Sequence, residues 1–338
     1  MELLSEHMDY LMHCPNCNSP VTLGDRYCQN CGASLDDTPP PAAPSPNPFR
    51  NLKVRWVIVW AAFCFAMTIV VVALGSLYLD ADPSDPMARL IAINLLYGSM
   101  LGWIIWQFRR KGIDIWQLVG RLPPRFSWFP VIGLLLVGYA FSTGALEVVG
   151  SLISVTMPEF LQSNTIMSDS PESSATYFIV GIATAAIVGP LWEEVFIRGV
   201  LINRWGIKWG IRNAIIASAA LFGITHGYDL FGAFMHGMVA AVLYIRTRTL
   251  LAPIALHAAH NTLATLLNFA SLAAGEPDTG SIAGDIESLV LGLALLTPTL
   301  PILVWYICKN WPSHYEPLPY QASGVGSFPA DRAADAED

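Results

Sequence analysis

Six side chains in the second half of the chain have the chemistry for acid–base catalysis or metal binding, and all of them lie in long apolar stretches. They are Glu193, Glu194, Arg198, His226, His257 and Asn261. A carboxylate with an imidazole can deprotonate water, and an imidazole with an amide can donate hydrogen bonds to the oxyanion that forms. Because a charged group in hydrocarbon is disfavoured unless it is paired or hydrated, ionisable residues in such stretches are candidates for function.

Helical spacing separates the two adjacent acids. Glu194 and Arg198 are four residues apart, so they share a helix face in the order that favours an ion pair. Glu193 points about 100° away on the helix wheel and stays free to hold a water or a metal ion. A purely structural salt bridge is equally compatible with the spacing of Glu194 and Arg198.

The three polar clusters are expected to meet at similar depths in a membrane. Counting about 1.5 Å per residue from one side puts Glu193 roughly 18 Å deep, His226 about 20 Å, His257 about 10 Å and Asn261 about 16 Å. Three separate helices would therefore bring a carboxylate, two imidazoles and an amide together. His236 is flanked by glycines, which allow close helix packing, so we expect it to pack against the site or support it.

Composition predicts an all-α polytopic membrane protein. Of the 338 residues, 54% are hydrophobic and 13% are charged, against about 25% charged in an average soluble domain. About eight segments have close to the ~20 apolar residues that a transmembrane helix needs. The expected spans are 54–79, 88–108, 128–157, 176–204, 211–227, 230–246, 250–271 and 286–308. The net charge of −8 is concentrated in loops and at the two ends, so we expect a lipid bilayer and no nucleic acid as the surroundings.

The basic residues predict the orientation of the spans. Placing the N-terminus in the cytoplasm puts every Lys and Arg except Arg89 on the inner side, as the positive-inside rule requires. We therefore expect a multi-pass cell-membrane protein with both termini cytoplasmic. The first fourteen residues carry acids and lack a basic region followed by an apolar one, so no cleavable signal peptide is evident.

Four cysteines near the N-terminus form two Cys-x-x-Cys pairs, Cys14 with Cys17 and Cys28 with Cys31. Two such turns supply four thiolates at tetrahedral reach, and so short a segment needs a metal ion to fold. We therefore predict a structural zinc ribbon. Two disulfides in an exported domain are the competing interpretation.

The membrane motifs resemble those of a known family. EExxxR at Glu193 to Arg198, FxxxH at Phe222 to His226 and HxxxN at His257 to Asn261 are similar to the motifs of the CPBP intramembrane proteases. That family includes the type II CAAX prenyl endopeptidases and the Abi bacteriocin-immunity proteins. The resemblance covers approximately residues 176–270 and implies an α-helical membrane fold, a cavity open towards the cytoplasm, and peptide-bond hydrolysis.

The resemblance also implies roles for the site residues. Glu193 and His226 would activate the attacking water, His257 and Asn261 would support the oxyanion, and Glu194 with Arg198 would shape the site. A catalytic zinc at Glu193, His226 and His257 and a metal-free, glutamate-activated water both stay open. The motifs contain no Ser or Cys nucleophile, which argues against a covalent acyl-enzyme.

The resulting prediction is an intramembrane endopeptidase that acts on a membrane-associated peptide or protein. Its expected parts are a zinc ribbon at 1–35, a Pro-rich linker at 36–50, a transmembrane protease-like domain at 51–310 with its motif core at 176–270, and a disordered tail at 311–338. The alternative is a non-catalytic membrane scaffold or immunity protein whose ribbon recruits a cytoplasmic partner. A transporter is weaker, because the first half of the chain shows no inverted-repeat counterpart of the site.

Overall fold

The structure is a computed structural model that describes residues 12–14, 16–22, 25, 27–33, 35, 47–79, 85–157, 175–273, 286–314 and 316–323. The chain divides into two compact units, Met1–Pro46 and Asn47–Asp338. Each unit is described by itself. Most of the predicted Pro-rich linker lies outside the described residues, and from Asn47 onward the chain belongs to the larger unit.

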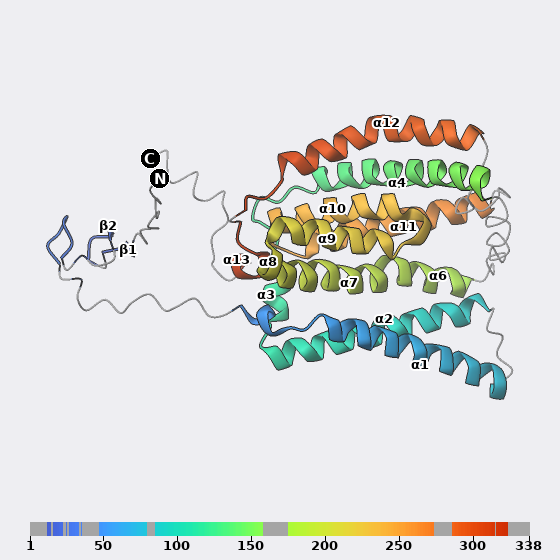
Figure 1. Ribbon diagram of the computed structural model, residues 1–338, viewed down its shortest axis with the longest axis horizontal. Coiled ribbons are helices and arrows are strands. Elements are labelled where there is room, and N and C mark those ends of the chain that lie inside the picture. The colour runs from blue at the N-terminus through green and yellow to red at the C-terminus, as the bar shows by residue number, and fades with distance from the viewer. Residues whose placement is uncertain are drawn as a thin grey trace, which may run out of the picture. The chain divides into compact units, whose positions relative to one another are not determined.

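The larger unit is a bundle of long helices (Figure 1). The long elements are α1 (Arg55–Leu79), α2 (Pro86–Lys111), α4 (Phe129–Thr156), α9 (Ile211–Ile224), α10 (Leu230–Thr247), α11 (Leu251–Ala273) and α12 (Ile286–Lys309). Between α4 and α9 the chain forms one helical run: α6 (Ala175–Ala183), η2 (Thr184–Val188), α7 (Gly189–Glu194), η3 (Val195–Ile202) and α8 (Asn203–Trp209). Short helices complete the unit: η1 (Pro48–Asn51), α3 (Ile115–Val119), η4 (Gly227–Asp229) and α13 (Pro319–Ser323).

The predicted all-α membrane class is confirmed, and the count of about eight spans is approximate. Among the described residues, six helices are long and apolar enough to cross a membrane. The two other expected spans are also helical. At 14 residues, α9 is only about 21 Å long, against the ~30 Å of a bilayer core. The 23 residues of α11 include two histidines and three other polar side chains before Leu266, which lower its apolar character.

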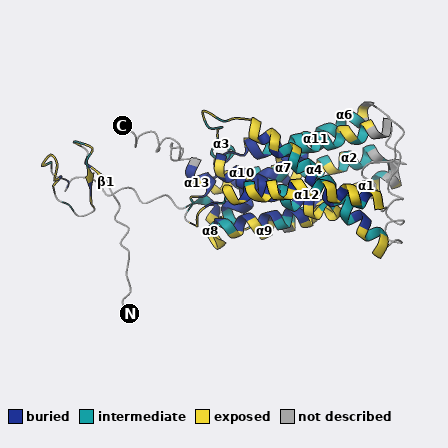
Figure 2. Ribbon diagram, turned by 90° about the horizontal axis from the view of Figure 1, so that it is seen from above, coloured by how far each residue is buried: buried dark blue, intermediate teal, exposed yellow. Residues whose placement is uncertain are grey.

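Burial differs strongly between the helices and locates the core. Of the apolar membrane-spanning stretch that contains α10, 61% is buried inside the protein. The buried share is 12% for the stretch in α1 and 11% for the stretch in α2. Figure 2 shows the exposed residues along α1 and the buried ones along α10. Exposed apolar side chains on α1, such as Phe65 and Val71, are suited to contact with lipid. The polar clusters therefore lie in the part of the bundle that the other helices cover.

The helical run that carries the two glutamates is widened on both sides of them. The stretches η2 and η3 are π-helical, and α7 lies between them. Pro190 has no N–H, so it cannot donate to a carbonyl in the preceding turn. The amide of Asn261 in α11 donates instead to the Ala185 carbonyl, at 3.1 Å. Such π-turns occur frequently at functional sites, and here the freed carbonyl ties α11 to the run.

The prediction of a disordered tail from residue 311 is wrong for residues 311–314 and 316–323. Helix α13 packs into the core, with Leu318 at 8% and Tyr320 at 6% exposure. The Tyr320 hydroxyl accepts a hydrogen bond from the Asp114 amide, at 3.0 Å, and its ring packs edge-on against Phe49, at 5.1 Å between centroids. Two buried apolar side chains with satisfied backbone groups offset the cost of ordering this segment. Residues 324–338 lie outside the described residues.

Candidate active site

A buried ion pair forms the base of the site. Arg198 Nη1 donates to Glu194 Oε1 at 2.7 Å, and both side chains are fully buried, so the pairing predicted from their spacing is present. Arg198 also lies over the Phe222 ring, at 4.8 Å from its centroid, and Nη2 points to the Gly237 carbonyl, at 3.4 Å. The ion pair therefore links four elements, α7, η3, α9 and α10.

His257 connects the two glutamates. Its Nδ1 lies 2.9 Å from Glu194 Oε1, and its Nε2 lies 3.7 Å from Glu193 Oε2. Because a carboxylate can only accept, Nδ1 carries the proton in this contact. The neutral ring then presents the lone pair of Nε2 towards Glu193. The side chain is almost completely buried, at 4% exposure, so its orientation is set by the two acids.

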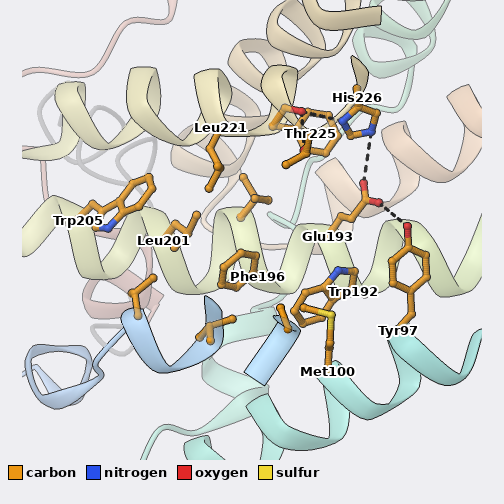
Figure 3. Close-up of a pocket in the computed structure, with 15 residues that line it drawn as sticks. Tyr97, Met100, Trp192, Glu193, Phe196, Leu201, Trp205, Leu221, Thr225 and His226 are labelled. Carbon is orange, nitrogen blue, oxygen red and sulfur yellow. Dashed lines mark hydrogen bonds and ion pairs between the residues drawn. The ribbon is translucent and has the colours of Figure 1, made fainter. Parts of the chain in front are cut away.

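Glu193 faces a second imidazole and a phenol. His226 Nε2 lies 3.9 Å from Glu193 Oε2, and the Tyr97 hydroxyl donates to Oε1 at 3.4 Å (Figure 3). The Phe222 carbonyl accepts from His226 Nδ1 at 2.7 Å, which leaves Nε2 of the neutral ring as an acceptor. The gaps from Oε2 to both imidazoles are too long for direct hydrogen bonds and short enough for a shared water. Nothing in the sequence around Tyr97 indicated this contact.

Five of the six predicted residues thus form one contact network, and Asn261 lies beside it. Glu193 and Glu194 come from α7, Arg198 from η3, His226 from the turn between α9 and η4, and His257 from α11. Asn261, one turn beyond His257, uses one N–H on the Ala185 carbonyl and keeps the second. It lines the same small cavity as His226 and His257.

His236 contributes more to this centre than its flanking glycines suggested. Its ring lies 4.9 Å from that of His257 and 5.2 Å from that of His260. Its Nε2 is buried and has no hydrogen-bond partner among the described residues. A metal ion needs several ligating atoms close together. Among the described residues of the larger unit, Glu194, His236 and His257 have such atoms within 4.8 Å of one another. Only His257 is common to this set and the predicted one.

An apolar cavity leads to Glu193. Its volume is about 560 Å³, and Glu193, His226 and Tyr97 lie at one end of it (Figure 3). The walls come from α1, α2, α7, η3, α8 and α9 and are mostly apolar: Val54, Val57, Ala61, Met100, Trp192, Phe196, Ile197, Leu201, Trp205, Leu221 and Phe222. The size and the apolar lining with a few polar groups are those of a ligand site.

Four cysteines in the smaller unit fit a tetrahedral metal. Strand β1 (Met12–His13) pairs antiparallel with β2 (Pro20–Val21), and the four Sγ atoms lie within 4.8 Å of one another. The Cys14–Cys31 and Cys17–Cys28 sulfur distances are both 3.6 Å. Zinc–sulfur bonds of about 2.3 Å place sulfurs about 3.8 Å apart in a tetrahedron, whereas a disulfide needs about 2.0 Å. Hydrogen bonds from Ser19 lower the pKa of the Cys17 thiol to about 6, whereas burial and contacts with Cys17 and Cys14 raise the pKa of the neighbouring Cys28 thiol to about 11. Zinc binding would have to release the proton that Cys28 keeps.

Comparisons with known families agree with both sites. The zinc-ribbon domain family matches residues 13–35, and the family described as type II CAAX prenyl endopeptidase Rce1-like matches residues 175–263. The chain contains an Rce1-like domain and a zinc-ribbon domain.

One curated relative extends beyond the Rce1-like domain. The chain is similar to an "Uncharacterized 24.3 kDa protein" of Escherichia coli, with 24% identity over 225 residues that cover 64% of this chain and 93% of that protein. No solved structure matches the chain.

The Rce1-like domain contains all six predicted site residues, from Glu193 to Asn261, and also His236. Tyr97 and the cavity walls from α1 and α2 lie outside it. The polar network is therefore internal to the domain, whereas part of the apolar cavity is supplied by the preceding helices.

The zinc-ribbon domain predicts a defined loss of metal. Replacing Cys14, Cys17, Cys28 and Cys31 together with serine is expected to lower the zinc content by one ion per chain, because the thiolates are the ligands. Elemental analysis of the purified full chain measures this. Cys64→Ser, a buried cysteine outside the ribbon, is the control and should leave the zinc content unchanged. An unaltered zinc content in the quadruple variant would contradict the assignment.

Proposed function

We propose that this protein is an intramembrane endopeptidase in which Glu193 and His226 activate a water that attacks a peptide bond of a membrane-associated substrate. The observation that carries the proposal is the position of the Glu193 carboxylate at the end of the apolar cavity, with His226 Nε2 at 3.9 Å. A carboxylate and an imidazole that face each other across the width of a water have the geometry of a general base.

In the proposed reaction, the Glu193 carboxylate moves one proton from the water to the leaving amine. Glu193 takes a proton from the water, and the hydroxide attacks the carbonyl carbon of the scissile bond. Glu193 then returns the proton to the leaving amine, so that one water is consumed for each bond cleaved. His226, whose ring is held by the Phe222 carbonyl, orients the water through Nε2.

The oxyanion would be stabilised by His257 and Asn261. Asn261 has a second N–H beyond the one used on Ala185, and this donor is available for the tetrahedral intermediate. His257 already donates through Nδ1 to Glu194, so it donates through Nε2 only when the ring carries both protons. Glu194 holds the His257 ring through its Nδ1, and Arg198 in turn holds Glu194.

A water nucleophile is favoured over a hydroxyl nucleophile. Besides the phenol of Tyr97, two residues with an aliphatic hydroxyl line the cavities at the site, Ser142 and Thr225. Ser142 Oγ donates to Asp229 at 2.7 Å, and Thr225 Oγ1 donates to the Phe222 carbonyl at 2.9 Å. Neither is hydrogen-bonded to an imidazole nitrogen, which a Ser–His or Thr–His pair would need.

The same hydrolysis could also use a catalytic metal ion, which is the second version of this proposal. Glu193, His226 and His257 would hold it, and it would lower the pKa of a bound water towards ~7. The tighter set of Glu194, His236 and His257 is less suited to a cation, because the guanidinium of Arg198 occupies Glu194 Oε1. The zinc count described above separates the two forms: a second zinc that survives the loss of the ribbon cysteines would support the metal.

The cavity is proposed to open towards the cytoplasm. Its wall residues Val54 and Trp205 lie near the end of the bundle that carries α3, α8 and α13 (Figure 1). Basic residues gather at that end, with Arg109, Arg110 and Lys111 in the last turn of α2, and the positive-inside rule makes it cytoplasmic. Both termini would then be cytoplasmic. The scaffold alternative is less favoured, since the Rce1-like match covers Glu193, Glu194, Arg198, His226, His257 and Asn261.

Cleavage of a membrane-anchored peptide tests the proposed activity. The full chain in liposomes is given an internally quenched peptide ending in an isoprenylated CAAX sequence, the same peptide with a saturated acyl chain, and the same peptide without a lipid. We expect cleavage of a lipidated form and little cleavage of the free peptide, because the apolar cavity of about 560 Å³ would bind the anchor or nearby apolar residues. No cleavage of any of the three, measured by mass spectrometry with the protein shown to be folded, would contradict the proposal.

A further inference from the structure

A second, smaller cavity lies next to the apolar one. Its volume is about 40 Å³, and it shares Phe222 and His226 with the apolar cavity. Seven of its ten lining residues have polar side chains, and they come from α4, α9, η4, α10, α11 and the turn after α9: Ser142, Phe222, His226, Asp229, Gly232, Ala233, His236, His257, His260 and Asn261. His226 therefore stands between an apolar space and a polar one.

Asp229 is held in this cavity by two neighbouring segments. Its Oδ2 accepts a hydrogen bond from Ser142 Oγ of α4, at 2.7 Å. Gly232 leaves the room for it, because a Cβ at that position would overlap both Asp229 Oδ1 and Ser142 Oγ. The Asp229 side chain is half-buried, and its carboxylate lies close against Gly232. In the sequence, Asp229 stands in a short turn three positions after His226, and no motif singles it out.

Two polar atoms of this lining have no hydrogen bond of good geometry within the described protein, although the Gly232 amide lies near the Asp229 carboxylate. They are Asp229 Oδ1, a hydrogen-bond acceptor, and His236 Nε2, and both are buried. A buried polar atom without a hydrogen bond costs about 1–3 kcal/mol. A cavity of only about 10–15 Å³ can hold a water, so a volume of about 40 Å³ is sufficient. One or two waters would satisfy both atoms.

We propose that this cavity binds ordered water that resupplies the hydrolytic site, with Asp229 as the positioning residue. This inference rests on the proposed function. Each turnover consumes one water, and a substrate that fills the apolar cavity would block bulk water from reaching Glu193 on that side. The polar cavity shares His226 with the apolar one, so its water can replace the one consumed. No group other than water and the peptide bond changes covalently.

The water itself is tested without an activity assay. A structure of the full chain in lipid nanodiscs, at a resolution that shows ordered solvent, is expected to contain water within about 3.2 Å of Asp229 Oδ1 and His236 Nε2. In Ala233→Val, whose added methyl groups enter the cavity from α10, that water should be lost. A dry cavity in the unaltered protein would overturn the inference.

Kinetics tests the role of Asp229. On the lipidated peptide, Asp229→Ala and Ala233→Val are each expected to lower kcat by about tenfold to a hundredfold with little change in KM, because water placement is lost while the substrate cavity is untouched. Asp229→Asn keeps an oxygen that can accept from Ser142 and should restore most of the rate. Unchanged kcat in both Asp229→Ala and Ala233→Val would overturn the inference.

A control separates this inference from the proposed function. Glu147→Gln removes a different half-buried acid, which lies in α4 and lines neither cavity. This variant should leave kcat unchanged. If Glu193→Gln retains cleavage, the proposed function itself fails. If Glu193→Gln is inactive and the Asp229 and Ala233 variants are fully active, only the inference about the water cavity fails.

Discussion

Glu193→Gln is expected to lower the rate of peptide-bond cleavage by roughly 10²–10⁴-fold, the range typical for loss of a general base. Glutamine has almost the same shape and cannot take a proton from water. The contact with the Tyr97 hydroxyl can persist, since the amide oxygen still accepts. The measurement is kcat and KM on the lipidated peptide in liposomes, with the variant and the unaltered protein at equal amounts.

Folding should be nearly unaffected by this change. The Glu193 side chain is 18% exposed, and its Oε2 has no hydrogen-bond partner among the described residues, so an isosteric amide leaves no new unpaired charge. Thermal unfolding in the same lipid should give a midpoint close to that of the unaltered protein. Cleavage at an unchanged rate by a folded Glu193→Gln protein would exclude Glu193 as the base.

Arg198→Met is expected to lower the free energy of unfolding by about 3–5 kcal/mol, the cost of breaking a buried ion pair by removing one partner. The change leaves Glu194 fully buried, with His257 as its remaining hydrogen-bond partner. The contact of the guanidinium with the Phe222 ring is lost as well. Denaturant unfolding in detergent micelles, followed by tryptophan fluorescence, measures the change.

The double variant Glu194→Gln/Arg198→Met tests the physical reason. With the charge of Glu194 also removed, part of the lost stability should return, because no uncompensated charge stays buried. If the double variant loses as much as the sum of the two single variants, the ion pair does not couple the two residues. Activity measured on the same proteins shows whether the pair also serves catalysis by holding His257, which the structural salt-bridge interpretation does not require.

Much of this protein can be predicted from residues that are close in the sequence. The four-residue spacing of Glu194 and Arg198 was sufficient to pair them, because helix geometry places such side chains on one face. Cys14, Cys17, Cys28 and Cys31 predicted the zinc ribbon for a similar reason, since two short turns define the ligand geometry. The apolar runs predicted the helices, and the similar depths predicted that three of them would bring Glu193, His226 and His257 together.

Segments far apart in the chain decided the rest. Tyr97 meets Glu193 across 96 positions, and Ser142 meets Asp229 across 87. Neither contact has a periodicity or spacing that could indicate it. Tyr320 packs on Phe49, although the composition around it is typical of a disordered tail. The reason is that Leu318 and Tyr320 are buried against apolar residues from distant parts of the chain.

The sequence by itself determined the class of protein, the four-cysteine zinc ribbon and the division of Glu193 from Glu194, and it predicted acid–base chemistry at the membrane site. These depend on local helix and turn geometry and on the cost of placing charge in hydrocarbon. Only the tertiary structure decided which atoms face one another around Glu193, that His236 lies in the centre, and that a polar cavity adjoins an apolar one. Cavities and unpaired atoms arise from the packing of several helices, and the chain order of those helices does not specify it.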